Sequence, residues 1–316
     1  MSVPVALLLF AGGLALVLVF SERLVESVVG TAANVGLSTF LISVLFVGFD
    51  PENLFIGGTG TWEGAPGIAL GTVVGSAMVA IALALGITAL AVPLRFERAP
   101  RPIVVLLPLP VGLFGALAAD GLLSRVDGGL LLGAYALALV WLYVLGRRGV
   151  HIEPSGEVAE ALHEDDSEET LWQAAGMLAV SLAAIAAGSK LVVEAGTVLT
   201  ARIGLTDTAF GMTLLALLVS IEELARELPA ALKGRPEIAL GNVVGSVLAF
   251  FLFNAGVIAL VRPVPVGADT RFFYVPVALL AVGFTAAVLL RRTVPRWAGG
   301  VLVALYAAFV VGGFLT

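Results

Sequence analysis

Long apolar stretches alternate with short polar segments along the whole chain, and this pattern predicts membrane-spanning helices. Crossing about 30 Å of hydrocarbon takes roughly 20 apolar residues. We expect the first stretch to be a retained helix rather than a signal peptide, because no charged segment precedes it. The predicted fold is an all-α membrane protein with ten transmembrane helices. The ten stretches are 3–20, 33–56, 67–93, 102–120, 128–146, 171–193, 204–232, 237–261, 272–290 and 297–315.

The chain carries an internal duplication. Residues 66–76 read PGIALGTVVGS and residues 236–246 read PEIALGNVVGS, so nine of eleven positions are identical. The duplication implies two five-helix repeats, over 1–146 with an alpha-1 motif and over 171–316 with an alpha-2 motif, joined by a linker at 147–170. An odd number of spans per repeat inserts the two halves in opposite senses. This is an inverted repeat, which brings a binding site to the midplane where the halves meet.

Composition narrows the class further. Hydrophobic residues form 59% of the chain and charged residues only 13%, whereas soluble domains carry about 25% charge. Cysteine is absent, and both histidines, His151 and His163, lie in the polar linker. These facts exclude thiolate chemistry and remove the usual zinc ligands from the membrane. The spans also lack hydrolase motifs such as His-Glu-x-x-His, so we expect no enzyme activity and no cofactor, and the net charge of −6 argues against nucleic acid as a partner.

The basic residues predict an orientation. If the segments after the odd-numbered spans share one side, that side holds eleven basic residues and the other side holds four. The excess predicts that the first side is cytoplasmic and that both termini are extracellular. The acidic segment at 147–170 is then a solvated cytoplasmic linker, and the compact loops fit a prokaryotic plasma membrane. The eleven are Arg23, Arg95, Arg98, Arg101, Arg147, Arg148, Lys233, Arg235, Arg291, Arg292 and Arg296.

Ionisable groups interrupt two of the apolar stretches, shortly before each copy of the repeated motif. The first group contains Asp50, Glu52 and Asn53. The second group contains Glu222, Glu223, Arg226 and Glu227. Because charges inside a membrane are costly, such groups usually mark an ion or proton pathway.

Several motifs are similar to those of the calcium/cation antiporter superfamily, which includes the sodium/calcium exchangers. These motifs are Gly-Asn-Val-Val-Gly-Ser at 241–246, which follows Glu223 by 18 residues, the Ile-Gly-Leu connector at 203–205, and Gly-Ser-Lys-Leu-Val-Val-Glu at 188–194. The resemblance covers both halves. It implies that the second, third, seventh and eighth spans cross to form an ion pocket.

The family motif Gly-Thr-Ser-Leu-Pro-Glu-Leu falls on residues 48–54 and 218–224. In this register the second family glutamate is Glu223, and the first is replaced by Asn53. The serine positions become Asp50 and Ser220, and the proline positions become Glu52 and Glu222.

The glycine-rich motif of the third and eighth spans keeps its serines as Ser76 and Ser246, but the family's Asn or Asp one turn later is Ala80 or Phe250 here. The acids have therefore moved rather than vanished, and they still suit a hard cation, because calcium takes six to eight oxygen ligands. We expect Glu52 and Glu223 to hold the transported calcium or sodium. The full set of predicted ion ligands is Asp50, Glu52, Asn53, Ser76, Ser220, Glu222, Glu223 and Ser246.

Helix geometry limits this set. Adjacent side chains on a helix point about 100° apart, so Glu222 and Glu223 cannot both face one ion unless the helix is broken. Pro51 makes a break credible in the second span, whereas the seventh has neither glycine nor proline between Met212 and Pro229. If the seventh span is an unbroken helix, the family register favours Glu223 over Glu222 as the acid that faces the ion. Arg226 either neutralises a carboxylate as a tethered cation, changing the ion coupling, or forms a structural pair with Glu222 or Glu227.

The prediction that follows is a secondary active antiporter that exchanges calcium, or a related cation, for sodium by alternating access. Cation/proton or sodium/proton exchange is the alternative, because desolvated neighbouring carboxylates favour the protonated form. A channel or a non-transporting membrane protein is the alternative of another class. The expected partners are small cations and the lipid bilayer, and the sequence leaves the oligomeric state open.

Overall fold

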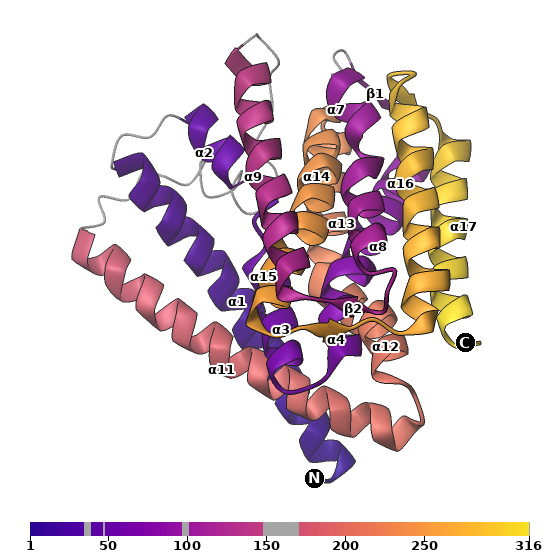
Figure 1. The fold of residues 1–316 in the computed structure, drawn as a ribbon. Helices are drawn as coiled ribbons and strands as arrows, with labels where there is room; N and C mark the ends of the chain where they lie inside the picture. Colours follow the sequence, from indigo (N-terminus) through magenta and orange to yellow (C-terminus); the bar gives the residue numbers. More distant parts are fainter. Residues whose placement is uncertain (35–38, 47, 97–100, 148–170, 316) are drawn as a thin grey trace.

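The computed structural model describes residues 1–34, 39–46, 48–96, 101–147 and 171–315, and their regular structure is almost entirely helical (Figure 1). The first half contains α1 Val3–Asn34, α2 Thr39–Leu45, α3 Pro51–Trp62, α4 Pro66–Leu70, η1 Gly71–Gly75, α5 Ser76–Met78, η2 Val79–Ala84, α6 Leu85–Ala91, α7 Arg101–Leu106, α8 Pro108–Leu117 and α9 Arg125–Arg147. The second half contains α11 Leu171–Ile203, α12 Asp207–Phe210, η3 Gly211–Leu215, α13 Ala216–Leu232, α14 Glu237–Leu248, η4 Ala249–Asn254, α15 Ala255–Val261, η5 Thr270–Tyr274, α16 Val275–Leu289 and α17 Arg296–Gly313.

Within the described residues, eight continuous helices are long and apolar enough to cross a membrane. The fourth predicted span is a shorter apolar helix, Arg101–Leu117, and the second is divided into α2 and α3. The chain is therefore an integral membrane protein of the predicted fold class. The predicted linker falls almost wholly on residues 148–170, which lie outside the described residues.

Several predicted boundaries are wrong, including those of the second span, whose helices α2 and α3 begin at Thr39 and end at Trp62 instead of residues 33 and 56. The first and sixth spans do not end at residues 20 and 193 but continue to Asn34 and Ile203. Polar residues in these extensions are accommodated on the helices: Arg23, expected in a loop, lies within α1 and pairs with Glu26 at 3.0 Å. The long helices α1 and α11 pack against each other and cross one side of the molecule (Figure 1).

Two short strand pairs link the halves. Strand β1 (Leu94–Arg95) pairs with β4 (Thr293–Val294), and β2 (Leu122–Leu123) pairs with β3 (Val264–Pro265), both antiparallel. Each pair takes one strand from each half, and the labels of β1 and β2 lie at opposite ends of the molecule in Figure 1. Strand pairing between the halves at both ends is expected when the two halves have opposite orientations.

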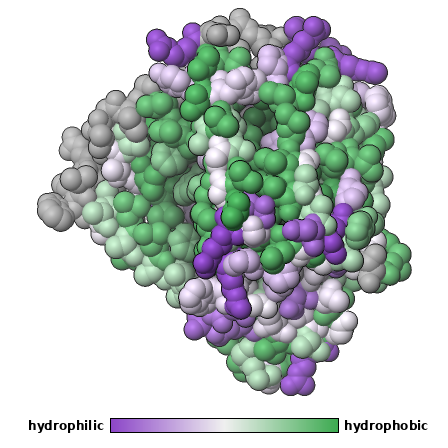
Figure 2. Space-filling view, viewed as in Figure 1, coloured by the Kyte–Doolittle hydropathy of each residue, from purple (hydrophilic) through white to green (hydrophobic). Residues whose placement is uncertain are grey.

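The repeated motifs lie on the most enclosed helices. The helical runs Pro66–Ala91 and Glu237–Val261 are mostly buried, whereas α9 exposes most of its surface. Large apolar side chains such as Val126 and Leu137 face outward on α9, and a broad apolar band covers the visible face in Figure 2. Lipid would contact this band, so the acids described below are held away from the hydrocarbon by the inner helices.

Candidate ion-binding site

The second span is broken, as the position of Pro51 predicted. Helix α2 ends at Leu45, and α3 begins at Pro51, where a missing N–H costs nothing. Asp50 caps α3, because its Oδ1 accepts a hydrogen bond from the Asn53 backbone N–H at 2.9 Å. Gly48 has a φ of 65° and packs on the backbone of Gly245, where a side chain would clash. The break therefore places Gly48 against α14, and nearby Asp50 lines the same pocket as Asn242 and Ser246 of that helix.

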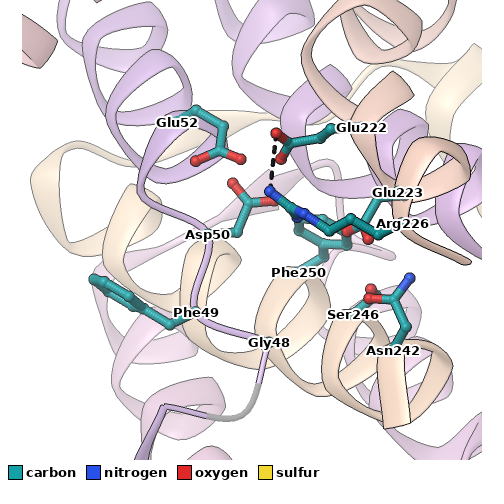
Figure 3. Close-up of a pocket in the computed structure, with 10 residues that line it drawn as sticks. All are labelled: Gly48, Phe49, Asp50, Glu52, Glu222, Glu223, Arg226, Asn242, Ser246 and Phe250. Carbon is teal, nitrogen blue, oxygen red and sulfur yellow. Dashed lines mark ion pairs between the residues drawn. The ribbon is translucent and has the colours of Figure 1, made fainter. Parts of the chain in front are cut away.

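The seventh span is not broken at its acids. Helix α13 runs without interruption from Ala216 to Leu232, and a π-helical segment, η3, precedes it. Glu222 and Glu223 nevertheless both line one pocket. They do so on different sides of it: in Figure 3, Glu222 lies with Asp50 and Arg226, whereas Glu223 lies toward Ser246 and Asn242.

This pocket gathers acids from both halves of the chain. Four carboxylates line it with a single basic side chain, Arg226 (Figure 3). Phe250, at the position where the exchanger motif has an acid or amide, also lines the pocket and is buried. The lining residues are Gly48, Phe49, Asp50, Glu52, Glu222, Glu223, Arg226, Asn242, Ser246 and Phe250.

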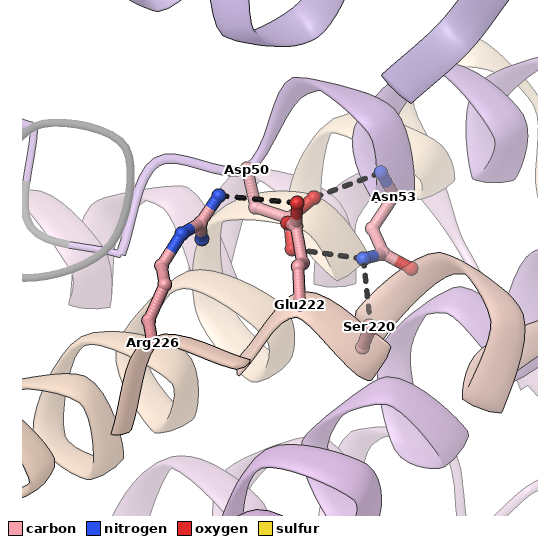
Figure 4. A network of polar contacts seen from close by, with 5 residues as sticks. All are labelled: Asp50, Asn53, Ser220, Glu222 and Arg226. Atoms are coloured by element: carbon pink, nitrogen blue, oxygen red, sulfur yellow. Dashed lines mark hydrogen bonds and ion pairs between the residues drawn. The ribbon is translucent and has the colours of Figure 1, made fainter. Parts of the chain in front are cut away.

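Three of the predicted neutral ligands form a hydrogen-bond network beside the pocket. The Asn53 Nδ2 donates to Asp50 Oδ2 at 2.8 Å and to Ser220 Oγ at 3.3 Å (Figure 4). Ser76 Oγ donates to Asn53 Oδ1 at 2.6 Å. Asn53, Ser76 and Ser220 are buried, and these contacts join α3, α5 and α13. In this arrangement the oxygens of Asn53 and Ser76 are directed at the network, not at the acids across the pocket.

Arg226 pairs with Glu222. Its Nη2 lies 3.1 Å from Glu222 Oε2, one helical turn away, and the two side chains are 17% and 28% exposed. The ion pair is drawn in Figures 3 and 4, and its side chains are more exposed than Glu52 and Glu223, which are buried. Of the two pairings considered for Arg226 as a structural group, the structure contains the one with Glu222.

Two polar residues next to the pocket were not among the predicted ligands. Asn242 lines the pocket, and its Nδ2 donates to Glu227 Oε1 at 2.7 Å. Both residues are buried. A signal for Asn242 was present, because it is one of two differences between the repeated motifs, where the first copy has Thr72. Glu227 belongs to the acidic group at 222–227 but lies one turn beyond the family register.

The carboxylates surround the pocket without converging on one point. Within the described ranges, no three acid or histidine side chains lie close enough together to hold a metal ion jointly. A cation bound here would be shared by acids on its two sides, with serine, amide and backbone oxygens completing the shell.

Comparison with known proteins agrees with these features. The family model described as "Sodium/calcium exchanger protein" matches residues 5–144 and 173–315. The chain is 30% identical over 274 residues to "Putative antiporter CaxA" of Alkalimonas amylolytica, covering 84% of each protein. It is also 35% identical over 136 residues to sodium/calcium exchanger MaX1 of Methanosarcina acetivorans, covering 42% of this chain and 39% of MaX1.

The fold is similar to that of a solved exchanger. The structure of the sodium-calcium exchanger NCX_Mj, soaked with 10 mM Na+ and 10 mM Sr2+, matches with a TM-score of 0.62. The match covers 98% of this chain and 99% of that chain at 23% identity. At this identity the similarity establishes the fold alone.

Proposed function

Because the chain belongs to the sodium/calcium exchanger family, we propose that it is a secondary active antiporter that exchanges calcium, or a related cation, for sodium. One observation carries the proposal: four carboxylates from two oppositely oriented halves line a single pocket, at a helix break. Charges are retained inside a membrane protein where they serve an ion pathway. The relatives described as exchangers and antiporters support the same class.

In this proposal, Glu52 and Glu223 are the main carboxylates that hold the cation, one from each half. Both side chains are buried, so a cation between them compensates charge that water does not reach. Asp50 and Glu222 add further charge, and Ser246 adds a neutral oxygen. Calcium accepts such a mixture of carboxylate, hydroxyl and water oxygens.

Asn53, Ser76 and Ser220 are proposed as ligands of the closed state. Their present hydrogen bonds satisfy one another, so turning their oxygens to an ion requires a replacement partner for each group. The cation supplies that replacement. Binding would therefore exchange the network for an ion shell, which couples occupancy to the packing of α3 against α13.

Alternating access follows from the two-fold construction. A site at the junction of inverted halves opens to one side when one half tilts and to the other side when the opposite half tilts. The empty acids repel one another, which disfavours the transition without an ion. Sodium ions, or protons bound at the same carboxylates, then allow the protein to return to its starting conformation.

The Arg226–Glu222 pair favours a second candidate, exchange with protons or with fewer sodium ions. A guanidinium already neutralises one of the four lining carboxylates, so less mobile charge is needed to fill the pocket. Cation/proton or sodium/proton exchange is therefore the alternative function to be tested in the same experiment.

The experiment is radioactive calcium uptake into proteoliposomes, driven separately by an outward sodium gradient and an outward proton gradient. We expect sodium-driven uptake that the variant Glu223→Gln abolishes, because the amide removes the charge while keeping the shape. Glu194→Gln is the matched control, since that residue forms an exposed pair with Lys190 at 3.6 Å. Uptake driven by protons alone would assign the acids to proton coupling. Unimpaired flux in the Glu223→Gln variant would show that Glu223 is not a ligand of the transported ion.

A further inference from the structure

Next to the ion pocket, α13 and α14 face each other with two levels of polar side chains. The helices are consecutive and joined by a short turn at 233–236, so they run antiparallel. Glu223 and Glu227 are four residues apart on α13, and Ser246 and Asn242 are four residues apart on α14. Residues at this spacing share one helix face. Ser246 therefore lies at the level of Glu223, and Asn242 lies one turn further on, at the level of Glu227.

The second level is deeply buried. Glu227 is 1% exposed, Asn242 is 6% exposed and Glu223 is 7% exposed. The Asn242 amide donates to Glu227 Oε1 at 2.7 Å and also interacts with Glu223. The Oε2 atoms of Glu223 and Glu227 are both buried, and neither has a hydrogen-bond partner among the described residues. Each of the two acids that interact with this amide therefore keeps one unsatisfied carboxylate oxygen.

The nearby charges do not compensate Glu227. Within the part of the chain that the structure describes, the charged side chain that acts on it is another carboxylate, Glu223. Arg226 pairs with Glu222 and also acts on Glu223, so Glu227 is the acid of the two on which this guanidinium has no recorded effect. A buried carboxylate without a counter-charge or a full set of hydrogen bonds is strongly unfavourable. This cost applies to the ionised carboxylate, and either a proton on Glu227 or a positively charged ligand beside the two acids would remove it.

We propose that Glu223, Glu227 and Asn242 form a second cation subsite that binds sodium. The inference rests on the proposed function, because it assigns the subsite to the pathway of the transported ion. A small monovalent ion fits better than calcium, since calcium takes six to eight oxygens and three side chains supply fewer. The subsite shares Glu223 and Asn242 with the pocket lining and extends it by one turn of α13 to Glu227, toward the basic turn with Lys233 and Arg235. An ion would occupy it between the central pocket and that end of the molecule.

The test measures sodium binding without any gradient, so it is independent of transport. Purified protein is melted at increasing sodium chloride, with choline chloride keeping the ionic strength constant. We expect Glu227→Gln to need at least about tenfold more sodium for half of the wild-type stabilisation, which corresponds to ~1.4 kcal/mol of lost binding free energy. Glu237→Gln, at the start of α14 and partly exposed, is the matched control and should titrate like the wild type.

Asn242→Asp provides a second variant in case Glu227→Gln fails to fold. It adds a carboxylate to the same level, and we expect it to lower the sodium concentration needed for stabilisation. Unchanged sodium titrations in both variants would overturn the subsite. A change in the pH dependence of melting without any change in sodium dependence would also overturn it, because Glu227 would then be a neutral structural group. In either case, sodium-driven flux that depends on Glu223 would leave the proposed antiport intact.

Discussion

At the scale of single residues, the two halves contribute the same chemistry in reversed order. The first half has an acid at Asp50 and a neutral amide at Asn53, whereas the equivalent positions of the second half are the neutral Ser220 and the acid Glu223. Asn53 contacts both Asp50 and Ser220. At these two equivalent positions, each half therefore has one acid and one neutral side chain. Asn53 connects the two halves through its hydrogen bond to Ser220.

Arg226 is the residue at which coupling is most directly tested. If its guanidinium acts as a tethered cation, Arg226→Ala should raise the number of sodium ions exchanged per calcium, because Glu222 becomes available to a mobile ion. The measurement is the reversal potential of calcium flux in proteoliposomes at several sodium gradients. Arg226→Lys keeps the charge and should retain the wild-type ratio. An unchanged ratio in the alanine variant, together with a lower melting temperature, would make the pair with Glu222 purely structural.

The limits of sequence-based prediction are clearest for Asn242 and Glu227. The acids that line the pocket could be identified because charges within apolar stretches are conspicuous. Asn242 is a small polar residue in a helix rich in small residues, and its importance comes from the face that α14 turns toward α13. Which helices are neighbours, and at which level, is a tertiary property. The spacing of residues along the chain does not contain it.

At the level of helices, the two copies of the pocket helix differ in shape, and two of the positions at which their sequences differ explain this. Gly48 and Pro51 allow the break between α2 and α3, whereas the equivalent positions of the second half are Leu218 and Ile221, which continue the helix. A positive φ suits glycine and a helix start suits proline, but leucine and isoleucine favour neither. The duplication therefore predicted the position of both pocket helices but not their different shapes.

Close contact between η1 and η3 also depends on glycine. Gly71 packs on the backbone of Gly211, where a Cβ atom would overlap the carbonyl group. We expect Gly71→Ala to destabilise the protein by about 1–3 kcal/mol, the usual cost of overpacking a buried contact. The measurement is the free energy of unfolding, followed through the melting temperature in detergent.

Gly133→Ala is the control for this contact. Gly133 lies on α9, and a methyl group added there would meet no atom of a neighbouring element within 4 Å. Alanine at this position should therefore be neutral or slightly stabilising. Equal melting temperatures for the two variants would show that the packing of η1 against η3 does not depend on the missing side chain.

At the scale of the whole molecule, the hydrophobic pattern predicted the fold class, and the structure added how the halves interlock. The strand pairs β1–β4 and β2–β3 each join one half to the other, and no alternation of apolar residues indicates two-residue strands. In Figure 1 both termini lie in the lower part of the view, the N-terminus at the bottom and the C-terminus at the right edge. That the termini are extracellular remains a prediction from the distribution of arginine and lysine.

An antiporter moves calcium out only when a counter-ion can enter, so calcium efflux distinguishes exchange at the shared pocket from free passage. Proteoliposomes loaded with radioactive calcium are diluted into calcium-free buffer containing choline, sodium or a raised proton concentration. We expect calcium to be retained in choline and to leave rapidly in sodium, or at a raised proton concentration for the alternative coupling. The reason is that the emptied carboxylates need a counter-ion before the carrier returns. Equally fast efflux in choline would mean that calcium crosses as through a channel and that the protein is not an antiporter.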